Sequence, residues 1–199
     1  MLNFSGPLSK SVLPKMVFFA SNKKIDELIE IYSHSTKLIA IISSSIAMII
    51  AFFSYNLLYA WTGNIEASVW GEEVLIWYIL GTSLMSITTL QYLLQLSYGN
   101  LKYQNIFNIF FPIITMPFIY IMAIKFGALG TAKAWFILQL LSLLIWSAFI
   151  HHKFLPRFHL SWIFKDILFP YTIAFCLLYF SRIVFDNYSF NDSRFYTFI

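Results

Sequence analysis

Long apolar stretches alternate with short polar ones along the chain. Five stretches carry no charged side chain or only one near an end. Each is close to the ~20 residues that a helix needs to cross ~30 Å of hydrocarbon, and amides inside a bilayer must be bonded within their own segment. The predicted spans are residues 38–60, 74–96, 106–126, 130–150 and 167–185. The pattern therefore predicts an all-α, polytopic transmembrane helix bundle of about five spans.

Residues 1–37 and 186–199 flank these spans. Pro7, Lys10, Pro14 and Lys15 interrupt the first apolar patches, so the segment is not typical of a signal peptide. From residue 21, apolar residues fall at helical spacing among charged ones. This pattern predicts a cytoplasmic segment with an amphipathic helix on the membrane surface, and a soluble juxtamembrane helix is the alternative. Residues 186–199 are predicted to form an outward-facing tail.

The composition supports the same class. Of 199 residues, 59% are hydrophobic and only 11% are charged, whereas globular chains average about 25% charged residues. So few charges cannot cover a water-facing surface, and so apolar a chain is not disordered. Cys176 is the only cysteine, which excludes a disulfide scaffold. The expected partner is a lipid bilayer, and no nucleic acid is expected.

Lysine and arginine are unevenly distributed between the two sides that alternate spans would connect. Nine lie on the side of the N-terminus and the loops around Lys102 and Arg157, and four lie on the other side. The positive-inside rule therefore predicts a cytoplasmic N-terminus. The loop Trp61–Glu73 and the C-terminus are predicted to face outward.

Polar side chains at membrane depth are the candidate substrate pathway. Thr88, Gln91 and Gln95 lie at positions i, i+3 and i+7 of the second predicted span. Glutamines in hydrocarbon are costly unless they face protein or water, so they either line a hydrated cavity or join helices by hydrogen bonds. Arg182, near the end of the last span, either contacts an anionic substrate or extends its guanidinium to the interface.

Prolines and glycines mark a candidate conformational hinge. Pro112 and Pro117 lie inside the third predicted span, where they free backbone carbonyls and can kink a helix. Gly127 and Gly130 belong to a turn of small residues that lets two helix ends pack closely.

Catalytic and metal-binding patterns are weak. No carboxylate lies inside a predicted span, and Asp166, like the other acids, is placed in a loop or at a span end. His151, His152 and His159 are predicted to lie in a polar cytoplasmic loop, and adjacent helical histidines point about 100° apart. We therefore expect no catalytic residue, no metal and no cofactor.

Several short motifs follow one another in a definite order. They are a tryptophan-glycine outer loop at 58–63, a Gly-Asn-Leu-Lys inner loop at 99–102, a span with two prolines, and a small-residue turn at 126–132. Their order resembles the C-terminal portion of a bacterial polysaccharide transporter of the O-antigen flippase group. That group shares a superfamily with multidrug and toxic compound extrusion transporters and lipid II flippases. The resemblance covers about Phe4 to Phe185.

The resemblance implies a two-lobe transporter of the bacterial inner membrane. Its lobes would rock to move an undecaprenyl-pyrophosphate-linked oligosaccharide, an O-antigen or capsule repeat unit, to the outer leaflet. This chain would be one lobe, a fragment that lacks the N-terminal lobe. Implied partners are the lipid-linked oligosaccharide and polysaccharide assembly machinery. Two alternatives remain open: a membrane-embedded polysaccharide-modifying enzyme or polymerase, and a portion of an ion-coupled drug exporter.

Overall fold

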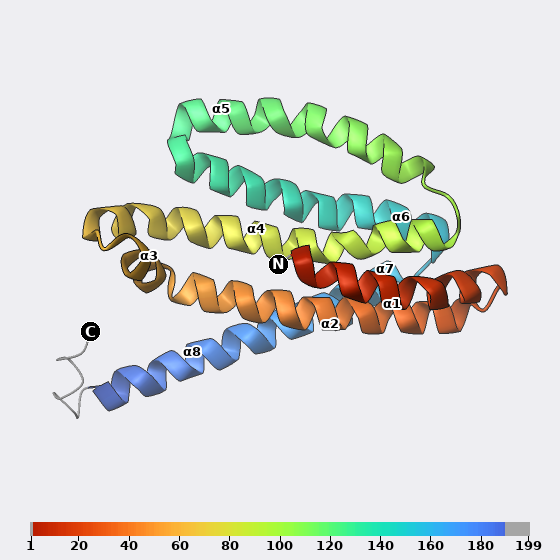
Figure 1. The fold of residues 1–199 in the computed structure, drawn as a ribbon, viewed down its shortest axis with the longest axis horizontal. Coiled ribbons are helices and arrows are strands. Elements are labelled where there is room, and N and C mark those ends of the chain that lie inside the picture. Colours follow the sequence, from red (N-terminus) through yellow and green to blue (C-terminus); the bar gives the residue numbers. More distant parts are fainter. Residues whose placement is uncertain (1, 190–199) are drawn as a thin grey trace.

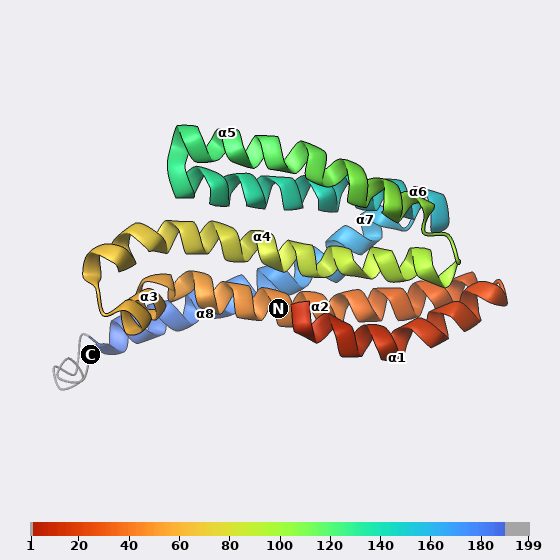
Figure 2. The same ribbon diagram turned by 45° about the horizontal axis from the view of Figure 1, so that its top comes forward.

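The computed structural model describes the backbone of residues 2–189 and the side chains of residues 10–181 and 183. The described residues form helices and connecting turns, without strands, arranged as a bundle of long helices (Figures 1 and 2). The helices are α1 (Leu2–Ser21), α2 (Ile25–Phe52), α3 (Ser54–Thr62), α4 (Ile65–Ser97), α5 (Lys102–Leu141), α6 (Ser147–Phe154), α7 (His159–Trp162) and α8 (Phe169–Ser189). Two π-helical segments, η1 (Ser142–Trp146) and η2 (Ile163–Leu168), continue the helices around them.

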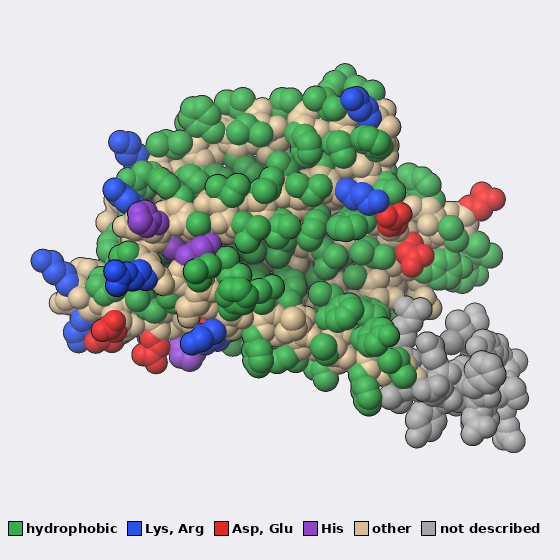
Figure 3. Space-filling view, turned by 180° about the vertical axis from the view of Figure 1, so that it is seen from behind, with side chains coloured by type: hydrophobic (Ala, Val, Ile, Leu, Met, Phe, Trp, Pro, Cys, Tyr) green, Lys and Arg blue, Asp and Glu red, His purple; other side chains and the backbone are tan. Residues whose placement is uncertain are grey.

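The apolar runs become helices long enough to cross a membrane. Within the described residues, four helical stretches have this length and composition: Ile25–Phe52, Ile65–Ser97, Lys102–Phe154 and His159–Ser181. The all-α prediction is confirmed, and the chain has the architecture of a multi-pass membrane protein. The face drawn in Figure 3 shows a broad hydrophobic belt, and most of the charged side chains visible on this face lie toward its two ends.

The longest stretch is a hairpin rather than one rod. It reverses direction at Gly127, where φ is 64° and ψ is −151°, and its two arms lie side by side in both views (Figures 1 and 2). That combination of angles is open essentially to glycine alone. Gly130 is needed for a second reason, because a Cβ there would lie 2.8 Å from the carbonyl oxygen of Met122. The reversal therefore falls between the third and fourth predicted spans.

The prolines do not make this turn. Pro112 and Pro117 both lie inside the first arm of α5, and the non-helical backbone of α5 is at Gly127. The proposed role of these prolines in motion stays a prediction.

The N-terminal part differs from its prediction. The amphipathic stretch is the beginning of α2 and runs without a break into the first span. That span ends earlier than predicted, because α2 stops at Phe52 and α3 begins at Ser54. The proline-interrupted segment is itself a helix, α1, which packs on α2 and α4 with Val12 and Met16 buried. Burial of these apolar side chains offsets the hydrogen bond that a mid-helix proline removes.

Candidate functional site

A pocket lies between α4, the two arms of α5 and η1, all within helical stretches long and apolar enough to cross a membrane. Its volume is about 300 Å³, at the lower end of the range for small-ligand sites. It is lined by Met85, Thr88, Thr89, Gln91, Tyr92, Gln104, Phe107, Asn108, Phe111, Gln139, Ser142 and Trp146. These twelve side chains are uncharged: some carry an amide or hydroxyl group, others are apolar or aromatic.

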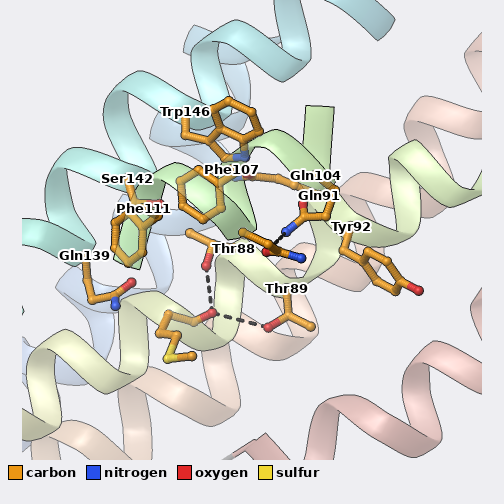
Figure 4. A pocket seen from close by; sticks show the side chains of 12 residues that line it. Thr88, Thr89, Gln91, Tyr92, Gln104, Phe107, Phe111, Gln139, Ser142 and Trp146 are labelled. Carbon is orange, nitrogen blue, oxygen red and sulfur yellow. Dashed lines mark hydrogen bonds between the residues drawn. The ribbon is translucent and has the colours of Figure 1, made fainter. Parts of the chain in front are cut away.

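Aromatic rings form one side of this α4–α5 pocket. Phe107 stacks on Phe111 with ring centroids 4.7 Å apart and on Trp146 at 4.6 Å. Thr88 and Thr89 lie across from these rings (Figure 4). Helical spacing within α5 brings residues 107 and 111 onto one face, and the fold-back at Gly127 brings Trp146 to them. The pocket thus combines a stack of aromatic rings on one side with hydroxyl groups on the facing helix.

Amide side chains connect the helices around the pocket. Gln91 donates from Nε2 to Ser147 Oγ. Gln95 Nε2 donates to Gln104 Oε1 at 3.1 Å, and Gln104 Nε2 donates to Asn108 Oδ1 at 3.0 Å. The Oε1 atoms of Gln91 and Gln95 are buried without a hydrogen-bond partner in the protein. An unpaired buried carbonyl oxygen is costly. A water or ligand hydroxyl would reach Gln91 Oε1 only when the helices around it separate, because this atom is buried.

The predicted pathway residues are brought together in part. Thr88 and Gln91 line the pocket. Gln95 is fully buried beside it and is linked to it through Gln104. Gln91 thus lines the pocket and also joins α4 to α6 through its hydrogen bond to Ser147. The side chain of Arg182 lies outside the described residues.

Most of the opposite wall was not predicted from the sequence. Gln104 and Asn108 come from the first arm of α5, Gln139 comes from its return arm, and Ser142 comes from η1. The i, i+4 spacing of Gln104 and Asn108 is a signal on one helix. Their meeting with Gln91 depends on how the hairpin packs, which no local pattern encodes.

A second polar cluster lies at the end of the bundle where the α1–α2 turn is found. We call Tyr32, Thr36, His151, His159 and Trp162 the histidine corner. The Tyr32 hydroxyl lies 2.9 Å from His151 Nε2, and His151 Nδ1 lies 3.0 Å from His159 Nδ1. Trp162 Nε1 donates to Thr36 Oγ1 at 3.0 Å. The corner joins α2 to α6 and α7 through side chains from all three helices.

Two expectations about charged or titratable residues are wrong. His151 is fully buried in α6 rather than in a polar loop, because the chain folds back between Phe154 and His159 and seals it under Trp162. Asp166 is also buried, inside the continuous helix His159–Ser181, and its Oδ1 lies 3.4 Å from Lys37 Nζ. The apolar helix begins before Lys165, so this acid lies within a span candidate.

Among the residues that the structure describes, no group of three or more His, Cys, Asp or Glu side chains could hold a metal ion. His151 and His159 instead bond each other and Tyr32. The side chains of the histidine corner thus bond one another across helices. The candidate site is the α4–α5 pocket.

No protein-family model, curated protein or solved structure matches the chain. The functional interpretation rests on the geometry of the α4–α5 pocket and on the resemblance in the motifs.

Proposed function

We propose that this chain is one lobe of a membrane transporter that moves a lipid-linked oligosaccharide across the bacterial inner membrane. In this proposal the N-terminus is cytoplasmic, and two lobes rock to carry an undecaprenyl-pyrophosphate-linked repeat unit to the outer leaflet. The observation that carries the proposal is the uncharged α4–α5 pocket, which lies between helices apolar enough to cross a membrane. The motif resemblance supports the same class of substrate.

The pocket chemistry suits the sugar portion of such a substrate. Sugar rings combine apolar C–H faces with hydroxyl groups that donate and accept hydrogen bonds. Phe107, Phe111 and Trp146 stack on one another and would supply apolar ring edges to the sugar. Gln91 would supply an unpaired acceptor once the helices around it separate, because its Oε1 is buried. No lysine or arginine lines the pocket, so the pyrophosphate would lie outside it.

The hairpin offers a way for the pocket to open. Its outer wall is the first arm of α5, which joins the return arm at Gly127. A few backbone angles at a turn are enough to let one helix swing relative to another. Rocking of this arm would widen the pocket toward one side of the membrane, and Pro112 and Pro117 would add local flexibility.

Binding to the full chain in lipid nanodiscs tests the proposal. The ligands are a fluorescent polyprenyl-diphosphate oligosaccharide and the same polyprenyl diphosphate without sugar. We expect tighter binding of the sugar-bearing lipid. Asn108→Leu should reduce that preference about fivefold, which corresponds to the loss of one hydrogen bond.

Asn105→Leu is the matched control, because Asn105 is an exposed amide on the same arm that does not line the pocket. It should leave the sugar preference unchanged. Equal binding with and without sugar would contradict the proposal. Tighter binding of a hydrophobic cation than of the glycolipid would instead favour the drug-exporter alternative.

A further inference from the structure

A second hollow lies apart from the α4–α5 pocket, where α2 packs against η2 and the start of α8. Its volume is about 540 Å³, and it is lined by Lys37, Ile41, Phe164, Lys165, Phe169 and Pro170. We call it the α2–η2 groove. Its floor is apolar, and its two charged lining residues are both lysines.

The groove changes from charged to apolar along its length. Ile41 lies one helical turn beyond Lys37 on α2, and Phe169 lies one turn beyond Lys165. Figures 1 and 2 show α2 and α8 side by side and running toward the same end of the bundle. Both lysines therefore lie at one end of the groove beside Phe164, and Ile41 and Phe169 continue from them along the two helices.

The charge at the lysine end is not fully balanced inside the protein. Lys37 Nζ pairs with Asp166 Oδ1 at 3.4 Å, and Asp166 is almost completely buried. Lys165 is exposed and forms no ion pair among the side chains that the structure describes. The two lysines and one carboxylate leave a net positive charge at the mouth of an apolar groove.

An anionic phospholipid has the matching distribution of charge. Its phosphate lies at the membrane interface, and its acyl chains extend into the hydrocarbon from there. Basic pockets between membrane helices bind such head groups through the same combination of charge and depth. A zwitterionic lipid offers the same acyl chain and phosphate but no net charge, so it gains less from the unbalanced lysine.

We propose that the α2–η2 groove is a binding site for an anionic phospholipid. The phosphate lies near the ammonium groups of Lys37 and Lys165, and one acyl chain packs along Ile41, Phe164 and Phe169. The bound lipid holds α2 against the helix that begins at His159. This site is independent of the α4–α5 pocket and of what that pocket carries.

Native mass spectrometry of the full chain tests the site. The chain is purified in detergent with an equal mixture of phosphatidylglycerol and phosphatidylcholine, and retained lipids are counted. We expect selective retention of one phosphatidylglycerol. Lys165→Gln should lower the selectivity about fivefold, the factor that one interfacial lysine contributes. The substitution is at an exposed position, so the fold is retained.

Lys153→Gln is the matched control, because Lys153 is exposed on α6 and does not line the groove. It should leave the selectivity unchanged. Equal retention of both lipids, or an equal loss in the two variants, would overturn the proposal. Displacement of the lipid by millimolar inorganic phosphate would show an anion site only and would also overturn it. Stronger retention of undecaprenyl phosphate than of phosphatidylglycerol would make the groove a substrate entrance instead.

Discussion

The α4–α5 pocket and the histidine corner both bury polar side chains between helices, but the two regions satisfy them differently. In the corner, Tyr32 and Trp162 each bond a side chain from a different helix. In and beside the pocket, Gln91 and Gln95 each bond through nitrogen and leave an oxygen buried and unpaired. A buried polar group without a hydrogen-bond partner lowers stability, whereas a buried group with its partners holds the helices in place. The corner therefore fixes helices to one another, whereas the two glutamines in and beside the pocket each keep an unpaired acceptor.

Packing separates the two regions in the same way. In an 18-residue apolar segment of Ile25–Phe52, 39% of the residues are buried inside the protein. In such a segment of Lys102–Phe154, 6% are buried. The corner is anchored on the central helix α2, whereas one pocket wall is the first arm of α5, in which Thr115 is the one described residue that is buried. An element with few buried contacts inside the protein separates from its neighbours at a lower free-energy cost. We therefore expect the first arm of α5 to move more readily than α2.

The largest expected effect comes from removing the ring at the centre of the corner. Trp162 is fully buried and stacks on Tyr32 with centroids 6.3 Å apart. Trp162→Ala should lower the free energy of unfolding by about 3–5 kcal/mol, the usual cost of truncating a buried aromatic side chain. The loss is measured as a lower unfolding temperature in detergent, with size-exclusion chromatography reporting the folded fraction at each temperature.

Leu160→Ala is the control for this change, since Leu160 is exposed on the same short helix. Phe111→Ala, in the partly exposed pocket wall, should cost clearly less than Trp162→Ala. If the two aromatic truncations cost the same, the corner is not the more tightly packed region.

The next effect concerns the turn that creates the pocket. Any side chain at Gly127 must adopt a φ of 64° with a ψ of −151°, which costs roughly 1–3 kcal/mol. Gly127→Ala should lower the thermal unfolding temperature and weaken ligand binding at the pocket together, because the two arms of α5 can no longer close at the same angle.

Gly71→Ala provides the comparison, since a Cβ at residue 71 meets only the flexible side chain of Leu58. It should change both measurements little. Unchanged stability and binding in Gly127→Ala would show that the hairpin tolerates another turn and that the pocket does not depend on this glycine.

The two regions also differ in how far the sequence predicts them. Most of the long helices follow from the apolar runs, because a bilayer sets the length of a span and leaves the backbone little choice but a helix. Gln91 could be singled out because an amide in hydrocarbon needs a reason to be there. Its partner Ser147 and the facing Asn108 could not, since they arrive through the packing of a hairpin.

The corner was not predicted at all. Tyr32 and His151 are 119 positions apart, and each has an ordinary local explanation as an amphipathic or loop residue. The turn that brings His159 back to His151 contains Arg157 in a left-handed conformation, with φ of 69°. Glycine usually marks such a position in a sequence, and there is none here. Asp166 was misplaced because the apolar run alone set the start of the last span, although the buried acid pairs with Lys37 from another helix.

A smaller effect is expected from deleting one hydrogen bond of the corner. Tyr32→Phe keeps the buried ring and removes the hydroxyl that lies 2.9 Å from His151 Nε2. Hydrogen bonds between membrane helices average about 0.6 kcal/mol and reach about 1.7 kcal/mol, and the unfolding free energy should fall by an amount in that range. The double variant with His151→Phe should cost less than the two single changes added, because both remove the same bond.

The smallest expected change in stability is at Gln91, and it separates the two regions most sharply. Gln91→Leu removes a bonded nitrogen and an unpaired buried oxygen together, so the lost bond is offset by the removal of an unmet acceptor. The free energy of unfolding should therefore change by less than about 1 kcal/mol in either direction. Ser147 Oγ, left without Gln91, can bond a carbonyl one turn back in its own helix. Binding of the sugar-bearing lipid should nevertheless weaken about fivefold, because the acceptor offered to the ligand is gone. A clear loss of stability with unchanged binding would contradict this prediction. It would mean that Gln91 holds helices together, as Tyr32 does, and that the pocket does not bind the ligand.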